Sequence, residues 1–404
     1  MVKDKKMEIS IIGGGASGLF AAIAAKNENT NVTIFEKEKR VGRKILATGN
    51  GRCNMTNINA TEADYHGRDT GFMKGAISRF WVKETLDFFG ELGVLWKEED
   101  GGKVYPYSDT ASSVLDVLRR RVDESGVKTE CEFPVKNISK TKEGFIITDY
   151  SGNKRKCDKV IVATGGKAGS TLGSDGSGYE LLKSFGHKIT PVSPSLVQIK
   201  TETDFVRKLK GIKVNAKVTL GDKTQTGELL FADYGISGPP VFWLSSYLGK
   251  NKEISIDFMP EYGYKEVYEM ICMRCAYLYD LPLEEFFVGM LNKRVSQALL
   301  KDAGIEPLSR PAHTLSEKEI KNITTAIKGL TLHIEGTASW NNAQVTKGGA
   351  VVSEFDSVKM ESKLVPGLYA CGEVLDIDGD CGGYNLQWAW SSGYLAGVAA
   401  GKDR

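Results

Sequence analysis

Three glycines with the spacing Gly13-x-Gly15-x-x-Gly18 follow the apolar run Ile-Ser-Ile-Ile at residues 9–12. The first glycine of such a set permits a tight turn, the second lets a pyrophosphate approach the backbone, and the third lets a helix pack closely on a strand. The Ala-rich segment 19–26 predicts that helix, whose unpaired N–H groups would face the phosphates. These residues predict a dinucleotide-binding turn.

An acidic residue follows the glycine turn at the sequence spacing typical of dinucleotide-binding folds. The segment NVTIFEK (31–37) predicts a second strand that carries Glu36, 18 residues after Gly18. A carboxylate at this place accepts hydrogen bonds from the adenosine ribose and disfavours a 2′-phosphate, which favours NAD or FAD over NADP. A purely structural glycine turn is the alternative, and the fingerprint alone does not separate FAD from NAD.

Two distant segments favour FAD. In residues 39–57, cations stand among glycines that allow close backbone approach, and they could balance a phosphate or an anionic reduced flavin: Arg43, Lys44 and Arg52 among Gly42, Gly49 and Gly51. A solvated basic loop is the alternative. Near the carboxyl end, a strand at 368–371 leads through a glycine-rich loop into a helix that begins near Asn385. The amino end of that helix would face the flavin N1/O2 edge.

With FAD, hydride or electron transfer takes place at flavin N5, and the protein supplies positioning and electrostatics. Five polar residues are candidates for a catalytic acid or base, although cofactor contacts would explain them equally well: Lys44, Arg52, Cys53, Thr346 and Lys347. No second cysteine lies within C-x-x-C reach of Cys53, so we expect a packed thiol and not a redox-active one.

The cysteine pair and the histidines are expected to have no catalytic or metal-binding role. The pair Cys272-x-x-Cys275 stands in EMICMRCAYL without a second pair or a nearby histidine, so a buried helix that includes Met270, Ile271 and Met273 is expected. The four histidines are isolated and receive no role. No metal is expected.

The triplet Asp376-x-Asp378-x-Asp380 resembles the start of a calcium loop. However, Cys381 stands where such a loop needs glycine, and Gln387 stands where it needs glutamate. We therefore assign no calcium site to this segment.

The amino-acid composition limits the kinds of binding partner that can be expected. The 404 residues hold 53 Lys and Arg against 51 Asp and Glu, so a small-molecule substrate is expected and a nucleic-acid partner is disfavoured. Seven scattered cysteines fit a reducing cytoplasm. No signal peptide and no apolar run of about 18 residues is found, so no membrane helix is expected. The oligomeric state stays open.

These residues need an α/β framework to position them. Helical patterns cover 71–92 and 110–125, and strands are expected over 127–149 and in KVIVATGG. Alternating Val, Ile, Thr and Phe between glycine turns over 195–260 predict antiparallel strands of a small β-barrel.

Five segments result: 1–191 and 346–404 as the two parts of an FAD-binding domain, 192–260 and 329–345 as the two parts of an inserted β-barrel, and 261–328 as a helical insert.

Four stretches carry a family resemblance: GRKILATGNGRCNMTN, VIVATGGKAG, AQVTKGGA and CGEVLDIDGDCGGYNLQWAWSSG. They resemble the signature segments of the bacterial aminoacetone oxidase-like, or BaiN-like, FAD-binding oxidoreductases, and the resemblance covers essentially the whole chain. It implies an α/β, Rossmann-like FAD domain of the glutathione reductase and fumarate reductase type, with a β-barrel domain and a helical insert between its halves.

The resemblance also implies roles for single residues. Pyrophosphate would lie at Gly13, Gly14, Gly15, Ala16, Ser17 and Gly18, and the adenosine at Glu36, Lys37 and Val135. The flavin would be bordered by Arg43, Lys44, Thr48, Gly49, Asn50, Gly51, Arg52, Cys53 and Asn54. Ala163, Thr164, Gly165 and Gly166 would cross beneath the cofactor. Ribityl or phosphate groups would meet Gly372, Glu373 and Asp376, and the isoalloxazine would meet Gly383, Tyr384, Asn385, Leu386 and Gln387.

One segment departs from the family pattern. GGKAGSTLGSDGSGYELL lacks the proline and the basic residue that often follow GGK, so the local loop and its ligand contacts are left open.

The leading interpretation is an FAD-dependent oxidoreductase that oxidises a small amine-type substrate or reduces a C=C bond with NAD(P)H. NAD(P)H would be a transient donor, because no second dinucleotide fingerprint is found. An FAD-dependent RNA-modifying enzyme and a non-catalytic flavin-binding redox sensor are the alternatives.

Overall fold

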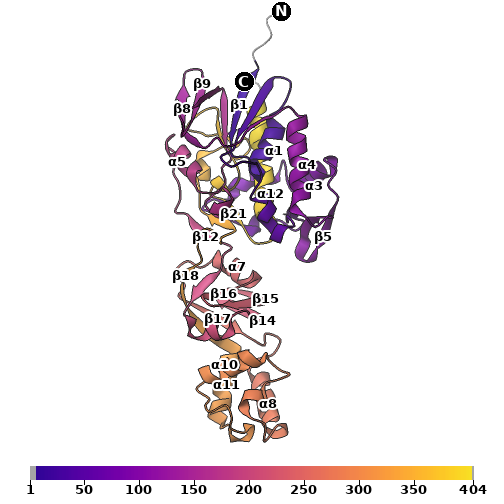
Figure 1. Cartoon of the computed structure of the whole chain (residues 1–404), viewed down its shortest axis with the longest axis vertical. Helices are drawn as coiled ribbons and strands as arrows, with labels where there is room; N and C mark the ends of the chain where they lie inside the picture. Colours follow the sequence, from indigo (N-terminus) through magenta and orange to yellow (C-terminus); the bar gives the residue numbers. More distant parts are fainter. Residues whose placement is uncertain (1–5, 403–404) are drawn as a thin grey trace, which may run out of the picture. The chain divides into compact units, whose positions relative to one another are not determined.

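A computed structural model describes residues 6–402. The chain forms two compact units: residues up to Pro194 together with those from Ala343 onward make the first, and Ser195–Asn342 make the second (Figure 1). The mixed α/β class and the closed β-barrel expected from the sequence are confirmed. The barrel and the helices inserted into it lie in one unit, and the five segment boundaries stay a prediction.

A five-stranded parallel sheet forms the centre of the first unit. Its order is β20-β11-β1-β2-β7, with bounds Leu368–Ala370, Lys159–Val162, Met7–Ile12, Thr30–Phe35 and Lys128–Glu130. Ile11 of β1 lies between Ile161 of β11 and Ile34 of β2, and all three are fully buried. Such continuous apolar runs are typical of parallel strands that are covered on both faces.

Two helices from opposite ends of the chain pack side by side in this unit, α1 (Ala16–Ala25) and α12 (Tyr384–Gly401) (Figure 1). Small residues at a spacing of four make the approach close: a Cβ built on each α12 glycine would lie 2.3 to 2.7 Å from a backbone oxygen of α1, in the pairs Gly393–Ser17, Gly397–Ala21 and Gly401–Ala25. Beside this contact the rings of Phe20 and Trp390 lie 4.6 Å apart.

Smaller elements surround this core. The other helices of the unit are α2 (Lys74–Ile77), α3 (Val82–Glu91), α4 (Ala111–Glu124) and α5 (Ser177–Lys183). Antiparallel sheets are formed by β8 (Val135–Thr141), β9 (Gly144–Asp149) and β10 (Lys154–Cys157), by β3 (Thr56–Asn57), β6 (Lys103–Pro106) and β5 (Trp96–Glu99), and by β4 (Tyr65–His66) with β21 (Asp378–Gly379).

The helix expected over 71–92 is interrupted. A 3₁₀ turn (Thr70–Met73) and α2 come first, and α3 begins only after Trp81, which has an extended backbone. The Trp81 N–H donates to the Glu84 carboxylate at 2.9 Å, a side-chain cap that starts a new helix. The helical pattern predicted over 71–92 thus corresponds to separate helical segments, because apolar periodicity does not report the break.

The second unit contains a closed antiparallel barrel in the order β13-β16-β15-β14-β17-β18. The strands are Ile199–Thr201, Gly235–Ser237, Lys223–Ala232, Lys213–Leu220, Glu253–Asp257 and Leu330–Thr337. Alternate residues such as Val218, Ile254 and Ile256 are fully buried and fill the barrel. Helix α7 (Pro239–Ser245) packs against β15.

Helices fill most of the sequence between β17 and β18. They are α8 (Tyr264–Tyr277), α9 (Leu283–Phe286), α10 (Lys293–Asp302) and α11 (Glu317–Gly329). Val267 and Ile271 of α8 are buried, but Met273 is 53% exposed and both Cys272 and Cys275 are only half-buried. The expectation that Met273 lies in the core was wrong, since it lies on the exposed side of α8.

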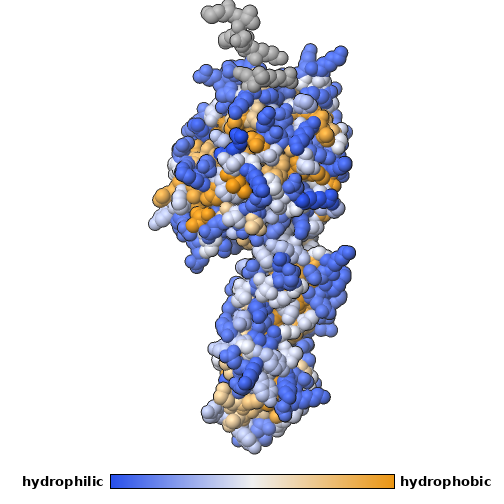
Figure 2. Space-filling view, turned by 180° about the vertical axis from the view of Figure 1, so that it is seen from behind, coloured by the Kyte–Doolittle hydropathy of each residue, from blue (hydrophilic) through white to orange (hydrophobic). Residues whose placement is uncertain are grey.

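The surface of the face shown in Figure 2 is mostly hydrophilic, with apolar areas scattered between charged side chains. Within residues 6–402, no helix has both the length and the apolar character that crossing a bilayer requires.

We predict that Gly397→Ala lowers the free energy of unfolding by about 1–3 kcal/mol, because its methyl group would overlap the Ala21 carbonyl and force α12 away from α1. Gly90→Ala is the matched control: it also lies in a helix, nothing stands within 4 Å of its Cβ position, and a gain of about 0.4–1 kcal/mol is expected. Thermal unfolding of both variants measures the difference, and equal effects would contradict the packing argument.

Candidate flavin site

The glycine turn between β1 and α1 has the geometry that the fingerprint requires. Gly13 has φ 102°, and a Cβ there would lie 2.6 Å from the Ala163 carbonyl oxygen. A Cβ on Gly18 would lie 2.0 Å from the Gly13 oxygen, whereas Gly15 has nothing within 4 Å. The first and third glycines therefore permit close packing, and the middle one leaves open space at the amino end of α1, where a pyrophosphate could approach.

Glu36 lies directly after β2 and holds this turn. Its carboxylate accepts hydrogen bonds from the Gly14 N–H at 2.8 Å and from the Glu38 N–H at 2.9 Å. The neighbouring Lys37 pairs with Asp175 at 2.6 Å. Val135, the expected adenine neighbour, begins β8 and is half-buried. The geometry keeps the Glu36 carboxylate at the edge of the nucleotide turn.

The loop after the turn has an irregular backbone. A 3₁₀ segment (Ile45–Gly51) is broken at Thr48, and Asn50 and Cys53 adopt left-handed φ values of 56° and 61°. Thr48 donates its hydroxyl hydrogen to the Ile45 carbonyl at 2.6 Å. Such backbone conformations cost free energy, and they persist only where surrounding contacts impose them.

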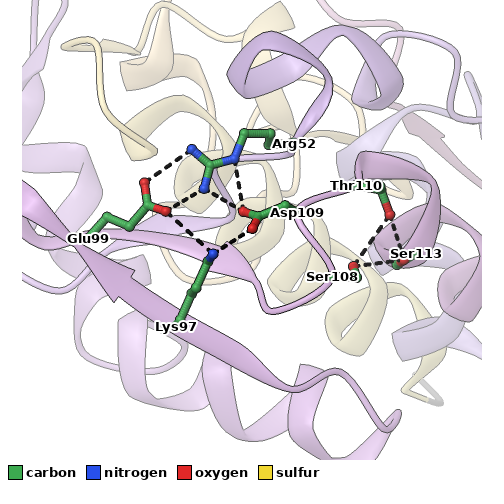
Figure 3. Close-up of polar contacts among 7 residues, drawn as sticks. All are labelled: Arg52, Lys97, Glu99, Ser108, Asp109, Thr110 and Ser113. Atoms are coloured by element: carbon green, nitrogen blue, oxygen red, sulfur yellow. Dashed lines mark hydrogen bonds and ion pairs between the residues drawn. The ribbon is translucent and has the colours of Figure 1, made fainter.

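Arg52 supplies part of that support. Its guanidinium binds the carboxylates of Glu99 and Asp109, and Lys97 pairs with Asp109 at 2.5 Å (Figure 3). The same guanidinium lies 4.1 Å from the centre of the Tyr105 ring. Hydrogen bonds to Glu99 and Asp109 raise the pKa of Arg52. Hydrogen bonds from Lys97 and Arg52 lower the pKa of Asp109. This cation is balanced by carboxylates of the protein.

Glu373 joins three distant segments. Its carboxylate accepts hydrogen bonds from the Lys44 ammonium at 2.8 Å and from the Thr346 N–H at 2.8 Å. The Thr346 hydroxyl oxygen in turn accepts from the N–H groups of Lys167 and Ala168 at 2.7 and 2.9 Å. Three of the residues singled out from the sequence, Lys44, Thr346 and Glu373, are therefore brought together.

The strand end that was expected beneath the cofactor lies against this junction. Ala163 and Thr164 follow β11, and Gly165 has a left-handed φ of 72°. A Cβ on Gly166 would lie 2.3 Å from the Thr346 hydroxyl oxygen and 2.7 Å from Glu373 Oε1. Only glycine allows the two segments to come this close.

The amino end of α12 is fixed by its own side chains. Gly383 precedes the helix with φ 105°, and Asn385 exchanges hydrogen bonds of 2.7 and 2.8 Å with the backbone of Gly379. Gln387 is fully buried and accepts a hydrogen bond from the Thr56 hydroxyl at 2.5 Å. Tyr384 and Leu386 are half-buried. These hydrogen bonds thus hold the glycine-rich loop before α12 and the amino end of α12 in fixed positions.

Buried polar atoms without partners test whether these residues fit FAD. Within residues 6–402, seven buried side-chain nitrogen or oxygen atoms have no hydrogen-bond partner, and five of them belong to Asn54, Tyr179, Asp376 and Asp378 of the first unit. Native proteins pair such atoms almost always, so they mark places where a polar ligand would supply partners. Asn54 lies in the flavin loop, and Asp376 and Asp378 lie in the loop before α12, so these positions fit FAD, whereas Tyr179 lies in α5.

The surroundings of Asp378 and His66 were not predicted from the sequence. Asp378 was considered only as a calcium ligand, and His66 was left without a role. In the structure Asp378 of β21 lies opposite His66 of β4 in an antiparallel strand pair. The His66 Nε2 atom lies 2.6 Å from Asp380 Oδ1. No local sequence pattern predicts a strand pairing between residues more than 300 positions apart.

Cys53 is fully buried, and burial raises the pKa of its thiol to about 12. A hydrogen bond with Thr48 opposes this shift but is the smaller effect. The thiol therefore stays protonated at neutral pH and is a poor nucleophile.

We predict that Glu36→Gln weakens FAD binding about tenfold to a hundredfold, since hydrogen bonds to a charged group contribute about 1.5–3 kcal/mol. Glu130→Gln on the adjacent strand β7, where the carboxylate pairs with Arg155, is the matched control and should leave the affinity unchanged. Titration of the apoprotein with FAD, followed by flavin fluorescence, measures both. Equal affinities of the two variants would contradict a ribose-binding Glu36.

We also predict that Cys53 resists alkylation by iodoacetamide at pH 8 in the native protein, because its thiol is buried and neutral. Peptide mass spectrometry gives the extent of labelling, and urea-unfolded protein, in which all seven cysteines should react, is the control. Rapid native labelling of Cys53 would show an accessible thiolate instead.

Comparison with known proteins identifies the family of the chain. The family model described as "HI0933-like protein Rossmann domain" matches residues 7–399. The "3-dehydro-bile acid delta(4,6)-reductase" of Clostridium scindens is 41% identical, with 97% of this chain and 98% of the relative covered. The "Ribosomal RNA dihydrouridine synthase" of Haemophilus influenzae is 31% identical, with 97% and 98% covered.

A solved structure shares the fold. The 3-ketosteroid delta1-dehydrogenase of Sterolibacterium denitrificans, in complex with 1,4-androstadiene-3,17-dione, matches 98% of this chain and 100% of its own with a TM-score of 0.50 and 12% identity. With the family model across nearly the whole chain and the relative at 41% identity, the chain belongs to the HI0933-like family and is an FAD-dependent oxidoreductase.

Proposed function

We propose that this protein uses NAD(P)H and FAD to reduce a C=C bond conjugated to a carbonyl group in a small organic molecule. The observation that carries the proposal is the 41% identity, over 97% of the chain, to a relative named as a delta(4,6)-reductase. The confirmed FAD-binding fold supports it, because bound FAD supplies hydride chemistry at N5.

The residues of the chain have defined tasks in this reaction. The glycine turn Gly13–Gly18 would bind the pyrophosphate, and Glu36 would bind the ribose. Glu373, held by Lys44 and Thr346, would accept a hydrogen bond from a ribityl hydroxyl. The amino end of α12 would stabilise negative charge on the pyrimidine side of the flavin. NAD(P)H would visit the flavin transiently, because the chain has one dinucleotide fingerprint.

RNA modification is the second candidate. The relatives from Haemophilus influenzae and Escherichia coli, 31% and 30% identical, are both named ribosomal RNA dihydrouridine synthases. The C5=C6 bond of uracil is also conjugated to a carbonyl, so the flavin chemistry would be the same. The balance of 53 basic and 51 acidic residues, together with the higher identity to the reductase, favours the small molecule.

A reducing compartment fits the cysteines. All seven are free, and they are scattered in a chain long enough to need no disulfides. We therefore propose a cytoplasmic location.

Anaerobic stopped-flow mixing with NADH and with NADPH tests the proposal. We expect one of them to bleach the flavin, and a 3-oxo-4,6-diene steroid to reoxidise it faster than buffer does, with loss of the dienone absorbance. An rRNA transcript serves as the competing acceptor, and dihydrouridine measured by mass spectrometry would identify the RNA reaction. Flavin that is bleached by aminoacetone, but not by NAD(P)H, would refute the reductase and indicate an oxidase.

A further inference from the structure

Two aspartates lie buried in the loop that connects Glu373 to α12. Asp376 is 3% exposed and Asp378 is 1% exposed. Neither oxygen of the Asp378 carboxyl has a hydrogen-bond partner, and the same holds for Oδ2 of Asp376. The strand pair β4–β21, in which Asp378 lies opposite His66, fixes the backbone at this point.

An ionised carboxylate in such a place is costly. A buried carboxylate without hydrogen bonds avoids the cost of its charge by taking up a proton. Burial is the largest effect on Asp378 and raises the pKa of its carboxyl to about 6. Burial also raises the pKa of Asp376, whose carboxylate is stabilised by Arg68 and Thr190.

Charged groups on four elements face Asp378. His66 on β4 and Lys347 on β19 (Val345–Lys347) favour the carboxylate, whereas Asp376 on the same loop and Glu373 on the preceding 3₁₀ turn favour the acid. His66 is engaged with Asp380 at 2.6 Å. The effects of the two carboxylates thus oppose those of His66 and Lys347, and burial has the largest effect on Asp378.

We propose that Asp378 holds the proton required by the reduction of the conjugated C=C bond and delivers it to the substrate. The inference rests on the proposed function. The hydride, which originates from NAD(P)H, brings the electron pair to the β-carbon. The O–H bond of Asp378 then breaks as a C–H bond forms at the α-carbon, and the carboxylate regains a proton from water. The product has gained one hydride and one proton, so atoms and charge balance.

The other polar groups of the site are less suited to this step. Lys44 and Thr346 are held by their bonds to Glu373, Lys167 and Ala168. Cys53, with a pKa raised to about 12, is a weak acid. Tyr179 is the rival donor, because its buried hydroxyl also has no partner, but burial raises its pKa far above neutrality. A donor pKa near the working pH favours Asp378.

Stability measures the proton without any turnover. Between the unfolded-state pKa of Asp, about 4, and the folded value of about 6, the folded protein binds more protons, so its stability falls as pH rises through this window. Asp378→Asn should remove this fall and raise Tm above pH 6 in the FAD-loaded protein. An unchanged pH profile of Tm would show that Asp378 holds no proton.

Single-turnover kinetics test the delivery. Dithionite-reduced enzyme is mixed anaerobically with the 3-oxo-4,6-diene steroid from pH 5 to 9, and flavin reoxidation is followed. In the wild type we expect the rate to fall as pH rises above about 6. In Asp378→Asn we expect a rate about a hundredfold lower at pH 6 and no such pH dependence, because general acids typically contribute factors of this size.

Three controls separate the explanations. Asp376→Asn, the same change on the same loop, should keep a pH dependence but shift it to lower pH, because Asp376 favours the acid form of Asp378. Reduction of Asp378→Asn by NAD(P)H should retain the wild-type rate. Loss of the pH dependence in Tyr179→Phe but not in Asp378→Asn would overturn the proposal, as would weakened FAD binding as the sole effect of Asp378→Asn. A wild type that reduces no alkene would refute the proposed function and the delivery step, while the Tm profile still decides whether Asp378 holds the proton.

Discussion

The contact between α1 and α12 is the constraint on which the nucleotide-binding unit depends. These helices lie at opposite ends of the chain, and glycines on α12 allow its backbone to meet that of α1. This approach places the loop before α12 beside the turn after β1: a Cβ on Gly372 would lie 2.5 Å from the Ser17 hydroxyl oxygen. The inserted residues Ser195–Asn342 can form their own unit because this contact closes the first one without them.

Within that frame, carboxylates of the protein balance the cations of the flavin loop. Lys44 pairs with Glu373, Arg43 with Glu38, and Arg52 with two acids. The sequence pattern suggested cations available for phosphate or reduced flavin. In the structure these cations form ion pairs that hold an irregular backbone in place, so the neutral N–H groups at the amino ends of α1 and α12 would be the donors best suited to the ligand.

The limits of sequence reasoning follow from the range of the interactions. The glycine turn, Glu36 and the barrel strands were predictable, because local spacing and alternation encode them. The break before Trp81 depends on a side-chain cap from Glu84, and the exposure of Met273 depends on which face of α8 packs, so periodicity missed both. The burial of Asp378 could not be predicted, because it needs the pairing of β21 with β4 across the chain.

The proposed reaction would be compatible with the unlike names of the relatives. Steroid-type dienones and uracil both present a double bond conjugated to a carbonyl, and saturation of either needs a hydride and a proton at adjacent carbons. A flavin site and a buried acid such as Asp378 would supply both without regard to the rest of the substrate. Under this proposal, discrimination between a small molecule and an RNA would arise from residues outside the flavin site, because phosphate contacts and salt-dependent binding are properties of the surrounding surface.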